Sequence, residues 1–137
     1  MKNNIFKIVT GIAGVYHVLL AAIGLLFPIE ITSKAFTLAL GVNIAATPQL
    51  EFIGKFVAVY MLAFGIILLV LAFNPAKYRA LTYAGLAVFG IRFINRIFFF
   101  SMLSTTFGMT TSRNLIGSAL IFLFFIGMLL TMPKKQS

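Results

Sequence analysis

The chain lacks cysteine, aspartate and tryptophan, and its few titratable side chains include only two carboxylates, Glu30 and Glu51, and one imidazole, His17. Without cysteine, the chain forms no disulfide, thiolate metal site or iron–sulfur cluster, and it has no thiol nucleophile. One copy of the chain also has too few carboxylates and histidines for a hydrolytic triad, a carboxylate dyad or a di-metal centre. We therefore assign no catalytic residues and no metal site, and the sequence identifies no cofactor.

Charged residues are scarce as well. They make up 9% of the 137 residues, against 61% hydrophobic residues, and the mean hydropathy is +1.09. Soluble domains contain about 25% charged residues. Four apolar segments each approach the roughly 20 residues that cross a hydrocarbon core of about 30 Å. The sequence predicts an all-α integral membrane protein, a single transmembrane domain built as a four-helix bundle, with spans at about 6–27, 51–73, 79–103 and 113–132.

The net charge of +9 would favour nucleic acid as the partner of a soluble protein. Here many of the cations flank the spans, where they set topology and meet lipid headgroups, so we expect membrane lipids and no nucleic acid. In the long connection, residues 28–50, Lys34 is the only cation that lies well clear of a span. The short-loop cations at the opposite ends of the spans are Lys2, Lys7, Lys77, Arg79, Lys134 and Lys135. The positive-inside rule predicts a multi-pass protein of the inner (plasma) membrane with both termini cytoplasmic and the 28–50 connection outside.

The third span contains two arginines, Arg92 and Arg96, with Asn95 beside them. An arginine near the middle of a bilayer costs about 2.5 to 3.5 kcal/mol, so these side chains need partners or water. Arg92 and Arg96 are spaced i,i+4 and share one helical face. At about 1.5 Å per residue from Arg79, they lie roughly 20 and 25 Å into the membrane, in its outer half.

The other spans carry polar residues at a comparable depth. Glu51 and Lys55 lie near the outer end of the second span, Asn114 begins the fourth, and His17 lies near the midplane in the first. If these faces turn inward, one carboxylate meets several cations, and an uncompensated buried charge costs several kcal/mol. Because arginine grips phosphate or carboxylate in bidentate fashion, we predict a site for an anionic or strongly hydrogen-bonding ligand. Its predicted residues are Arg92, Arg96, Asn95, Lys55, Glu51, His17 and Asn114.

The charged residues and His17 also have other interpretations. The arginines can extend to the headgroups, and Glu51 and Lys55, at i,i+4, can form a local interfacial ion pair. His17 suits helix packing, proton handling or a bond to a quinone, and haem ligation would require a second ligand or a second chain. The phenylalanine-rich runs 97–100 and 122–125 go round their helices and are interpreted mainly as lipid contacts.

Other patterns predict how the helices begin, end and pack. Gly14, His17, Ala21 and Gly24 share one face of the first span, which is small enough for close helix approach. Pro28, Pro75 and Pro133 end spans, and Thr47 is a helix cap. Residues 101–112 are interpreted as an uncharged turn. Within the long connection, residues 34–40 are expected to form a short interfacial helix or to pack back over the bundle.

Three short motifs give the chain a family resemblance. They are the first-span end Ala22-Ile23-Gly24-Leu25-Leu26-Phe27-Pro28, the second-span end Phe73-Asn74-Pro75, and Gly90-Ile91-Arg92 followed by Asn95-Arg96. With them the chain resembles the small four-span bacterial membrane proteins grouped as BphX-like and DoxX-like. Some of those proteins are named as accessory subunits of quinone-linked oxidase systems, so the resemblance implies a redox-accessory or lipophile-binding role. Where they often carry a cation early in the second span, this chain has Lys55.

The function that these observations favour is non-enzymatic binding of an amphiphile, such as a lipid, a quinone or another apolar acid, in an outer-half basic pocket. The protein would act alone, as a homo-oligomer or as an accessory subunit of a membrane partner. One alternative is a small anion transporter or channel in which Arg92, Arg96 and Lys55 select the anion. Another is a membrane enzyme acting on a lipophilic substrate with His17 or Glu51 as base.

Overall fold

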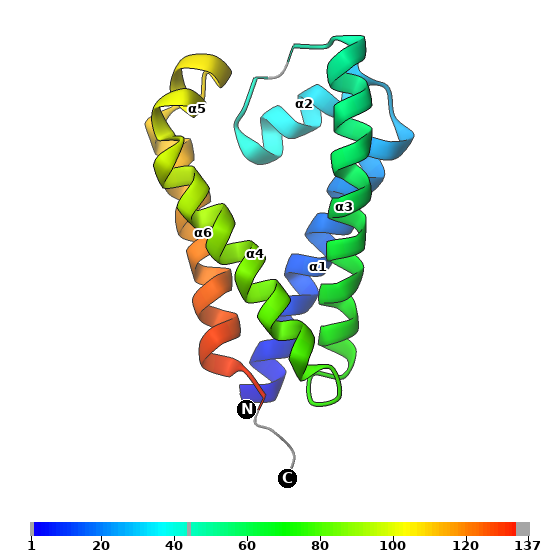
Figure 1. Ribbon diagram of the computed structural model, residues 1–137, viewed down its shortest axis with the longest axis vertical. Coiled ribbons are helices and arrows are strands. Elements are labelled where there is room, and N and C mark those ends of the chain that lie inside the picture. The colour runs from blue at the N-terminus through cyan, green and yellow to red at the C-terminus, as the bar shows by residue number, and fades with distance from the viewer. Residues whose placement is uncertain (1, 44, 134–137) are drawn as a thin grey trace.

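The computed structural model describes residues 2–43 and 45–133, and this part of the chain is helical with short connections. Figure 1 shows the order of the helices, which are α1 Lys2–Leu26, α2 Ile29–Leu40, α3 Pro48–Phe73, α4 Arg79–Phe98, α5 Phe100–Phe107 and α6 Thr111–Thr131. Among the described residues, four helices, α1, α3, α4 and α6, are long and apolar enough to cross a membrane. The predicted all-α class with four helices of spanning length is confirmed. Lys134 and Lys135, which entered the charge argument, lie outside the described residues.

The helix ends follow the local signals. The hydroxyl of Thr47 accepts a hydrogen bond from the backbone N–H of Leu50, and Pro48 opens the first turn of α3. Helices α1, α3 and α6 end at Leu26, Phe73 and Thr131, in each case two residues before a proline. Proline lacks a backbone N–H and disfavours the α conformation in the residue before it. The predicted cap and the predicted proline terminations are confirmed.

The third predicted span is shorter than expected. Helix α4 ends at Phe98 rather than at residue 103, and α5 begins at Phe100 after a single non-helical position. The predicted turn over residues 101–112 is therefore wrong for most of its length. No residue of α5 is buried, and the helix is closed by a glycine C-cap, in which the N–H of Gly108 donates to the carbonyl oxygen of Leu103. Met102 and Leu103 line a cavity beside α4. The turn itself is confined to residues 108–110, where Gly108 adopts φ +61°.

Helices α1 and α3 form one closely packed pair. The four residues of the predicted small face, Gly14, His17, Ala21 and Gly24, are all buried. A Cβ at Gly14 would lie 3.0 Å from the carbonyl oxygen of Gly65. The reverse holds for Gly65, where a Cβ would lie 3.0 Å from the carbonyl oxygen of Gly14. The two backbones touch at these glycines, which is the close contact that small residues permit between membrane helices.

Helices α4 and α6 form the second pair, and the two pairs together make a V (Figure 1). They meet at the end where α1 begins and α6 ends, here called the narrow end. There a Cβ at Gly127 in α6 would lie 3.4 Å from the side chain of Val9 in α1. Within the second pair, the Nε of Arg79 donates to the carbonyl oxygen of Pro133 at 2.8 Å. A core that includes Phe6, Leu71 and Met128 fills this part of the bundle. Toward the other end, the wide end, the pairs separate.

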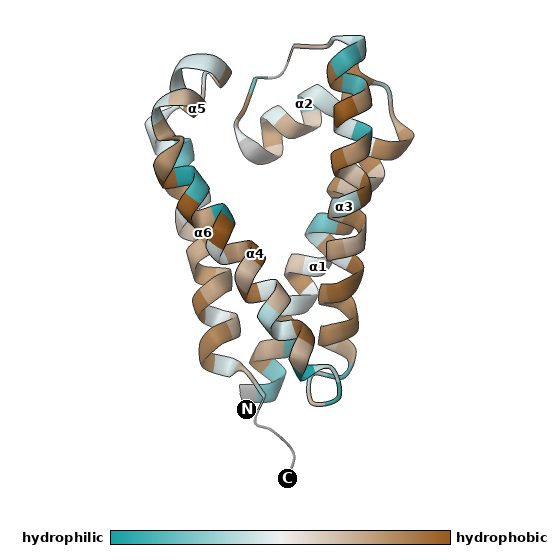
Figure 2. Cartoon of the chain, in the orientation of Figure 1, coloured by the Kyte–Doolittle hydropathy of each residue, from teal (hydrophilic) through white to brown (hydrophobic). Residues whose placement is uncertain are grey.

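Helix α2 bridges the wide end between the two pairs (Figure 1). At its start the hydroxyl of Thr32 donates to the carbonyl oxygen of Ile23 in α1 at 3.3 Å. At its end the carbonyl oxygen of Thr37 accepts from Nη1 of Arg113 in α6 at 3.2 Å. The predicted helix over residues 34–40 is thus part of a longer helix of 12 residues that packs over the bundle. Figure 2 shows that the long helices are hydrophobic, and that hydrophilic residues interrupt α4 in its half toward the wide end.

Candidate ligand-binding site

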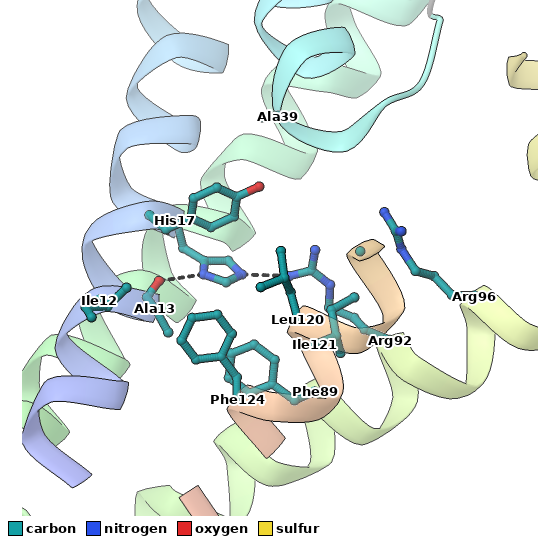
Figure 3. Close-up of a pocket in the computed structure, with 12 residues that line it drawn as sticks. Ile12, Ala13, His17, Ala39, Phe89, Arg92, Arg96, Leu120, Ile121 and Phe124 are labelled. Carbon is teal, nitrogen blue, oxygen red and sulfur yellow. Dashed lines mark hydrogen bonds between the residues drawn. The ribbon is translucent and has the colours of Figure 1, made fainter. Parts of the chain in front are cut away.

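His17 of α1 and Arg92 of α4 are hydrogen-bonded to each other inside the V (Figure 3). The Nδ1 of His17 lies 2.7 Å from the carbonyl oxygen of Ala13, and its Nε2 lies 2.7 Å from Nη1 of Arg92. A carbonyl oxygen only accepts and a guanidinium only donates. The proton of the imidazole is therefore on Nδ1, and Nε2 accepts from Arg92. The ring is neutral and both of its nitrogens are engaged.

Aromatic side chains hold the imidazole in this orientation. His17 is 3% exposed. The ring centroids of Tyr16, Phe64 and Phe89 lie 5.5, 5.1 and 6.0 Å from its own, all at edge-on angles. These rings come from α1, α3 and α4, so three helices fix the position of the group that meets Arg92. Edge-to-face packing of this kind adds about 0.5 to 1.5 kcal/mol per aromatic pair.

Arg96 lies one turn beyond Arg92 and contacts α6. Its Nη1 is 3.3 Å from the backbone oxygen of Asn114 and 3.4 Å from the side-chain oxygen of the same residue. These distances are beyond the usual range of strong N–H···O bonds. A Cβ at Gly117 would overlap the Arg96 guanidinium, so the missing side chain is what lets this group rest on α6. Asn114 itself is buried, at 3% exposure.

A cavity of about 310 Å³ lies between α1, α4 and α6, with Ala39 of α2 at its edge. Figure 3 shows Arg92 directed toward His17 across this space, while Arg96 extends from the next turn of α4. The two guanidiniums are its charged groups, and its walls are mostly aliphatic and aromatic. The residues that line it are Ile12, Ala13, Tyr16, His17, Ala39, Phe89, Arg92, Arg96, Gly117, Leu120, Ile121 and Phe124.

Arg92 also borders two further spaces. A second cavity of about 310 Å³ toward α5 is lined by Arg92, Arg96 and Asn95 together with apolar side chains. A cleft of about 630 Å³ between α3 and α4 is lined by His17 and Arg92 among apolar residues. Asn95, predicted as a site residue, is exposed and reaches the second cavity rather than the first. The His17–Arg92 bond thus lies where the first cavity and the α3–α4 cleft adjoin.

Glu51 and Lys55 are not part of this arrangement. They pair with each other at 2.7 Å on α3, with side chains 33% and 47% exposed, and neither lines the cavity. The prediction that Glu51 balances the arginines is wrong, and so is the placement of Lys55 in the same pocket. The pair lies in the first turns of α3 at the wide end, while α3 packs chiefly on α1. The local ion pair, left open by the sequence, is confirmed.

The site therefore combines two cations with neutral partners. Within residues 2–43 and 45–133, the structure records one ion pair, Glu51–Lys55, while the recorded partners of Arg92 and Arg96 are His17 and Asn114. Placing charge in an apolar surrounding without an opposite charge is costly, and an anion that accepts from both guanidiniums would offset that cost. Among the same residues, no group of three or more His, Cys, Asp or Glu side chains is arranged to hold a metal ion. A haem iron would have to displace Arg92 from Nε2 of His17.

Several lining residues were not identified from the sequence. Ile121 and Phe124 lie at i+4 and i+7 from Gly117, on the face that begins with Asn114, so helical spacing was a usable signal. Phe124 lines the cavity, although the run 122–125 was interpreted mainly as lipid contact. Tyr16, next to His17 in sequence, borders the cavity as well, whereas Ala39 reaches it only through the path of α2. No family model, curated protein or solved structure matches the chain.

Proposed function

We propose that this protein is a non-enzymatic, multi-pass protein of the plasma membrane that binds an amphiphile in the cavity between α1, α4 and α6. The observation that carries the proposal is the pair of guanidiniums, Arg92 and Arg96, which have neutral recorded partners and face apolar walls. The headgroup, anionic or rich in hydrogen-bond acceptors, would meet the arginines. The apolar part would pack against Phe89, Ile121 and Phe124. A lipid, a quinone or another apolar acid has this composition.

The proposal includes an orientation. The cations Lys7, Lys77 and Arg79 belong to the narrow end of the V, and the positive-inside rule favours the cytoplasm for that end. In this orientation both termini are cytoplasmic and the cavity lies toward the outer leaflet. Because the chain has no cysteine, a single introduced thiol reports on topology without background. A membrane-impermeant maleimide applied to intact cells should label Ser104→Cys in α5 and leave Ala76→Cys unlabelled, and the opposite pattern would invert the orientation.

The binding proposal is tested by the molecules that the protein retains. The wild type and the variants Arg92→Gln and Arg96→Gln would be purified gently, and bound amphiphiles quantified by mass spectrometry. Charge-assisted hydrogen bonds contribute about 1.5 to 3 kcal/mol each, so each variant should retain about 10- to 100-fold less ligand. Arg79→Gln is the matched control, because it removes the same charge from the same helix at the narrow end. Full retention by both cavity variants would refute the proposal.

A second function, anion transport, is favoured by one observation: Arg92 borders all three of the spaces described above. A small anion passing between them would meet this side chain. Proteoliposomes would then conduct anions, and Arg92→Ala would abolish the flux. Lys55 would have no part in selection, because it does not line these spaces. Retention of an amphiphile without anion flux supports the binding function instead.

The amphiphile-binding proposal agrees with the lipophile-binding role that the resemblance to BphX-like and DoxX-like proteins implies. The same resemblance supports a role as an accessory subunit of a membrane complex. Crosslinking in native membranes followed by identification of the attached chains would test this part. Recovery of a homo-oligomer alone would replace the accessory role with self-association.

A further inference from the structure

The cavity opens sideways between α1 and α6. Three of its lining residues, Ile12 and Tyr16 of α1 and Leu120 of α6, are also at the surface, with 58%, 38% and 52% of their area exposed. On the opposite side the cavity is lined by the buried side chains of His17 and Phe89, with His17 standing between it and the α3–α4 cleft. In a membrane, the surface of the long helices at this level faces hydrocarbon. An apolar molecule can therefore pass between the bilayer and the cavity without crossing water.

A groove along α1 continues from this opening. Ile12 and Tyr16 line both the cavity and a surface groove of about 580 Å³, so the two spaces share a border. The groove extends from Leu19 to Lys7, a distance of about 18 Å at a rise of about 1.5 Å per residue. Apart from Lys7 and Tyr16, the side chains along it are aliphatic or absent, and they are those of Ile8, Gly11, Ile12, Val15 and Leu19. This surface suits one extended hydrocarbon chain.

Charge and size narrow the class of ligand. Two guanidiniums whose recorded partners are neutral favour a negatively charged headgroup over a neutral one such as a quinone ring. The cavity volume, about 310 Å³, is at the lower end of the roughly 300 to 1,000 Å³ typical of small-molecule sites. It holds a headgroup and the start of a chain, whereas the rest of the chain must leave through the opening. One groove on α1 accommodates one chain.

We propose that the ligand is a single-chain amphiphile with an acidic headgroup, a phosphate monoester or a carboxylate, that enters from the bilayer between α1 and α6. The headgroup binds Arg92 and Arg96, and the chain leaves past Ile12 and Leu120 and lies in the groove on α1. This inference rests on the proposed function and deepens it. In the proposed orientation the chain runs from the outer-leaflet level toward the narrow end, which is the direction of the lipid tails in that leaflet.

The test is photo-crosslinking in nanodiscs of phosphatidylcholine with a long-chain alkyl phosphate that carries a diazirine in mid-chain. Crosslinks should map to residues 7–19. Leu120→Trp narrows the opening and should lower the crosslinking yield at least tenfold, and Ile12→Trp should do the same from the opposite rim. Leu123→Trp is the matched control, since Leu123 is 64% exposed on the same helix and does not line the cavity. Its yield should stay within twofold of that of the wild type.

Competitors define the ligand class. An alkyl carboxylate of the same length should displace the probe, whereas the matched alcohol and inorganic phosphate should not, and two-chain phosphatidic acid should compete at least tenfold less well. Equal competition by the alcohol, an unaffected yield in both opening variants, or crosslinks that map to residues 57–67 in the α3–α4 cleft would overturn the inference. Those outcomes leave the proposed function standing as long as Arg92→Gln abolishes probe binding. Binding that Arg92→Gln and Arg96→Gln leave intact would remove the proposed function itself.

Discussion

The two helix pairs of this protein pack differently, one through small residues and the other through large side chains. In the α1–α3 pair, backbone meets backbone at Gly14 and Gly65, and a Cβ at Gly24 would lie 2.9 Å from the Cβ of Ala58. In the α4–α6 pair, aromatic rings fill the contact, with Phe89 stacked on Phe124 at a centroid distance of 5.8 Å. Small residues bring the helices of one pair into backbone contact, whereas large side chains fill the contact within the other pair. The site lies between the pairs, in the cavity lined by α1, α4 and α6.

Breaking the close pair should have the largest effect on stability. In Gly65→Leu, the new Cβ would lie 3.0 Å from the backbone nitrogen of Val18 and from the carbonyl oxygen of Gly14, and neither can move without the helix. We expect a loss of about 3 kcal/mol, at the upper end of the cost of overpacking. Unfolding in detergent, followed by circular dichroism, measures it. Gly54→Leu is the control, because no other side chain and no other helix lies within 4 Å of its Cβ position. An equal loss there would mean that the contact between α1 and α3 is not the cause.

The next effect concerns the bond that joins the two pairs, His17 to Arg92. His17→Phe leaves Arg92 without this acceptor, and Arg92→Leu leaves Nε2 of His17 without a donor. We expect each single variant to be less stable than the double variant, with a coupling free energy of about 1.5 to 3 kcal/mol, the range for hydrogen bonds to charged groups. Denaturation of all four proteins of the cycle measures it. Additive effects would mean that the bond makes no net contribution.

Gly117→Ala should affect ligand retention and protein stability differently. The added Cβ would displace the Arg96 guanidinium from α6, so the retained amphiphile should fall several-fold. Alanine also favours the helix by up to about 1 kcal/mol relative to glycine, so stability should not fall in parallel. Gly127→Ala on the same helix, where a Cβ meets only Val9 at 3.4 Å, should leave retention unchanged. Equal retention in both variants would place Arg96 outside the binding interaction.

The smallest effect is expected at Glu51. Its ion pair with Lys55 is partly exposed, and such pairs contribute about 0 to 1 kcal/mol. Glu51→Gln should therefore change the unfolding free energy by about 0.5 kcal/mol or less and leave amphiphile retention unchanged. Thermal denaturation and mass spectrometry of the same sample report both quantities. Loss of the ligand in this variant would restore the carboxylate to the site, as the sequence alone predicted.

The sequence predicted correctly those features that depend on neighbouring residues in the chain, such as helix ends and helix faces. Thr47 and the prolines mark helix ends, and the glycine-rich face of α1 packs as its spacing predicts. Counting residues along the spans brought His17, Arg92, Arg96 and Asn114 to a comparable level, and in the structure Arg92 is hydrogen-bonded to His17 and Arg96 to Asn114. The same count misplaced Lys55, because depth along a helix does not determine its rotation about its axis. That rotation depends on which helix α3 packs against, and this is a tertiary property.

The position of α2 determines how far apart the two helix pairs lie at the wide end. This helix of 12 residues connects the two pairs, with a hydrogen bond to α1 at Thr32 and a hydrogen bond to α6 at Thr37. These two contacts are five residues apart, about 7.5 Å at a rise of about 1.5 Å per residue, and the segment between them acts as a spacer between the two arms of the V. The width of the opening between the two pairs, beside the arginines, therefore depends on a segment outside the four long helices. Removing one turn between Thr32 and Thr37 would draw the arms together and favour a smaller ligand without altering Arg92 or Arg96.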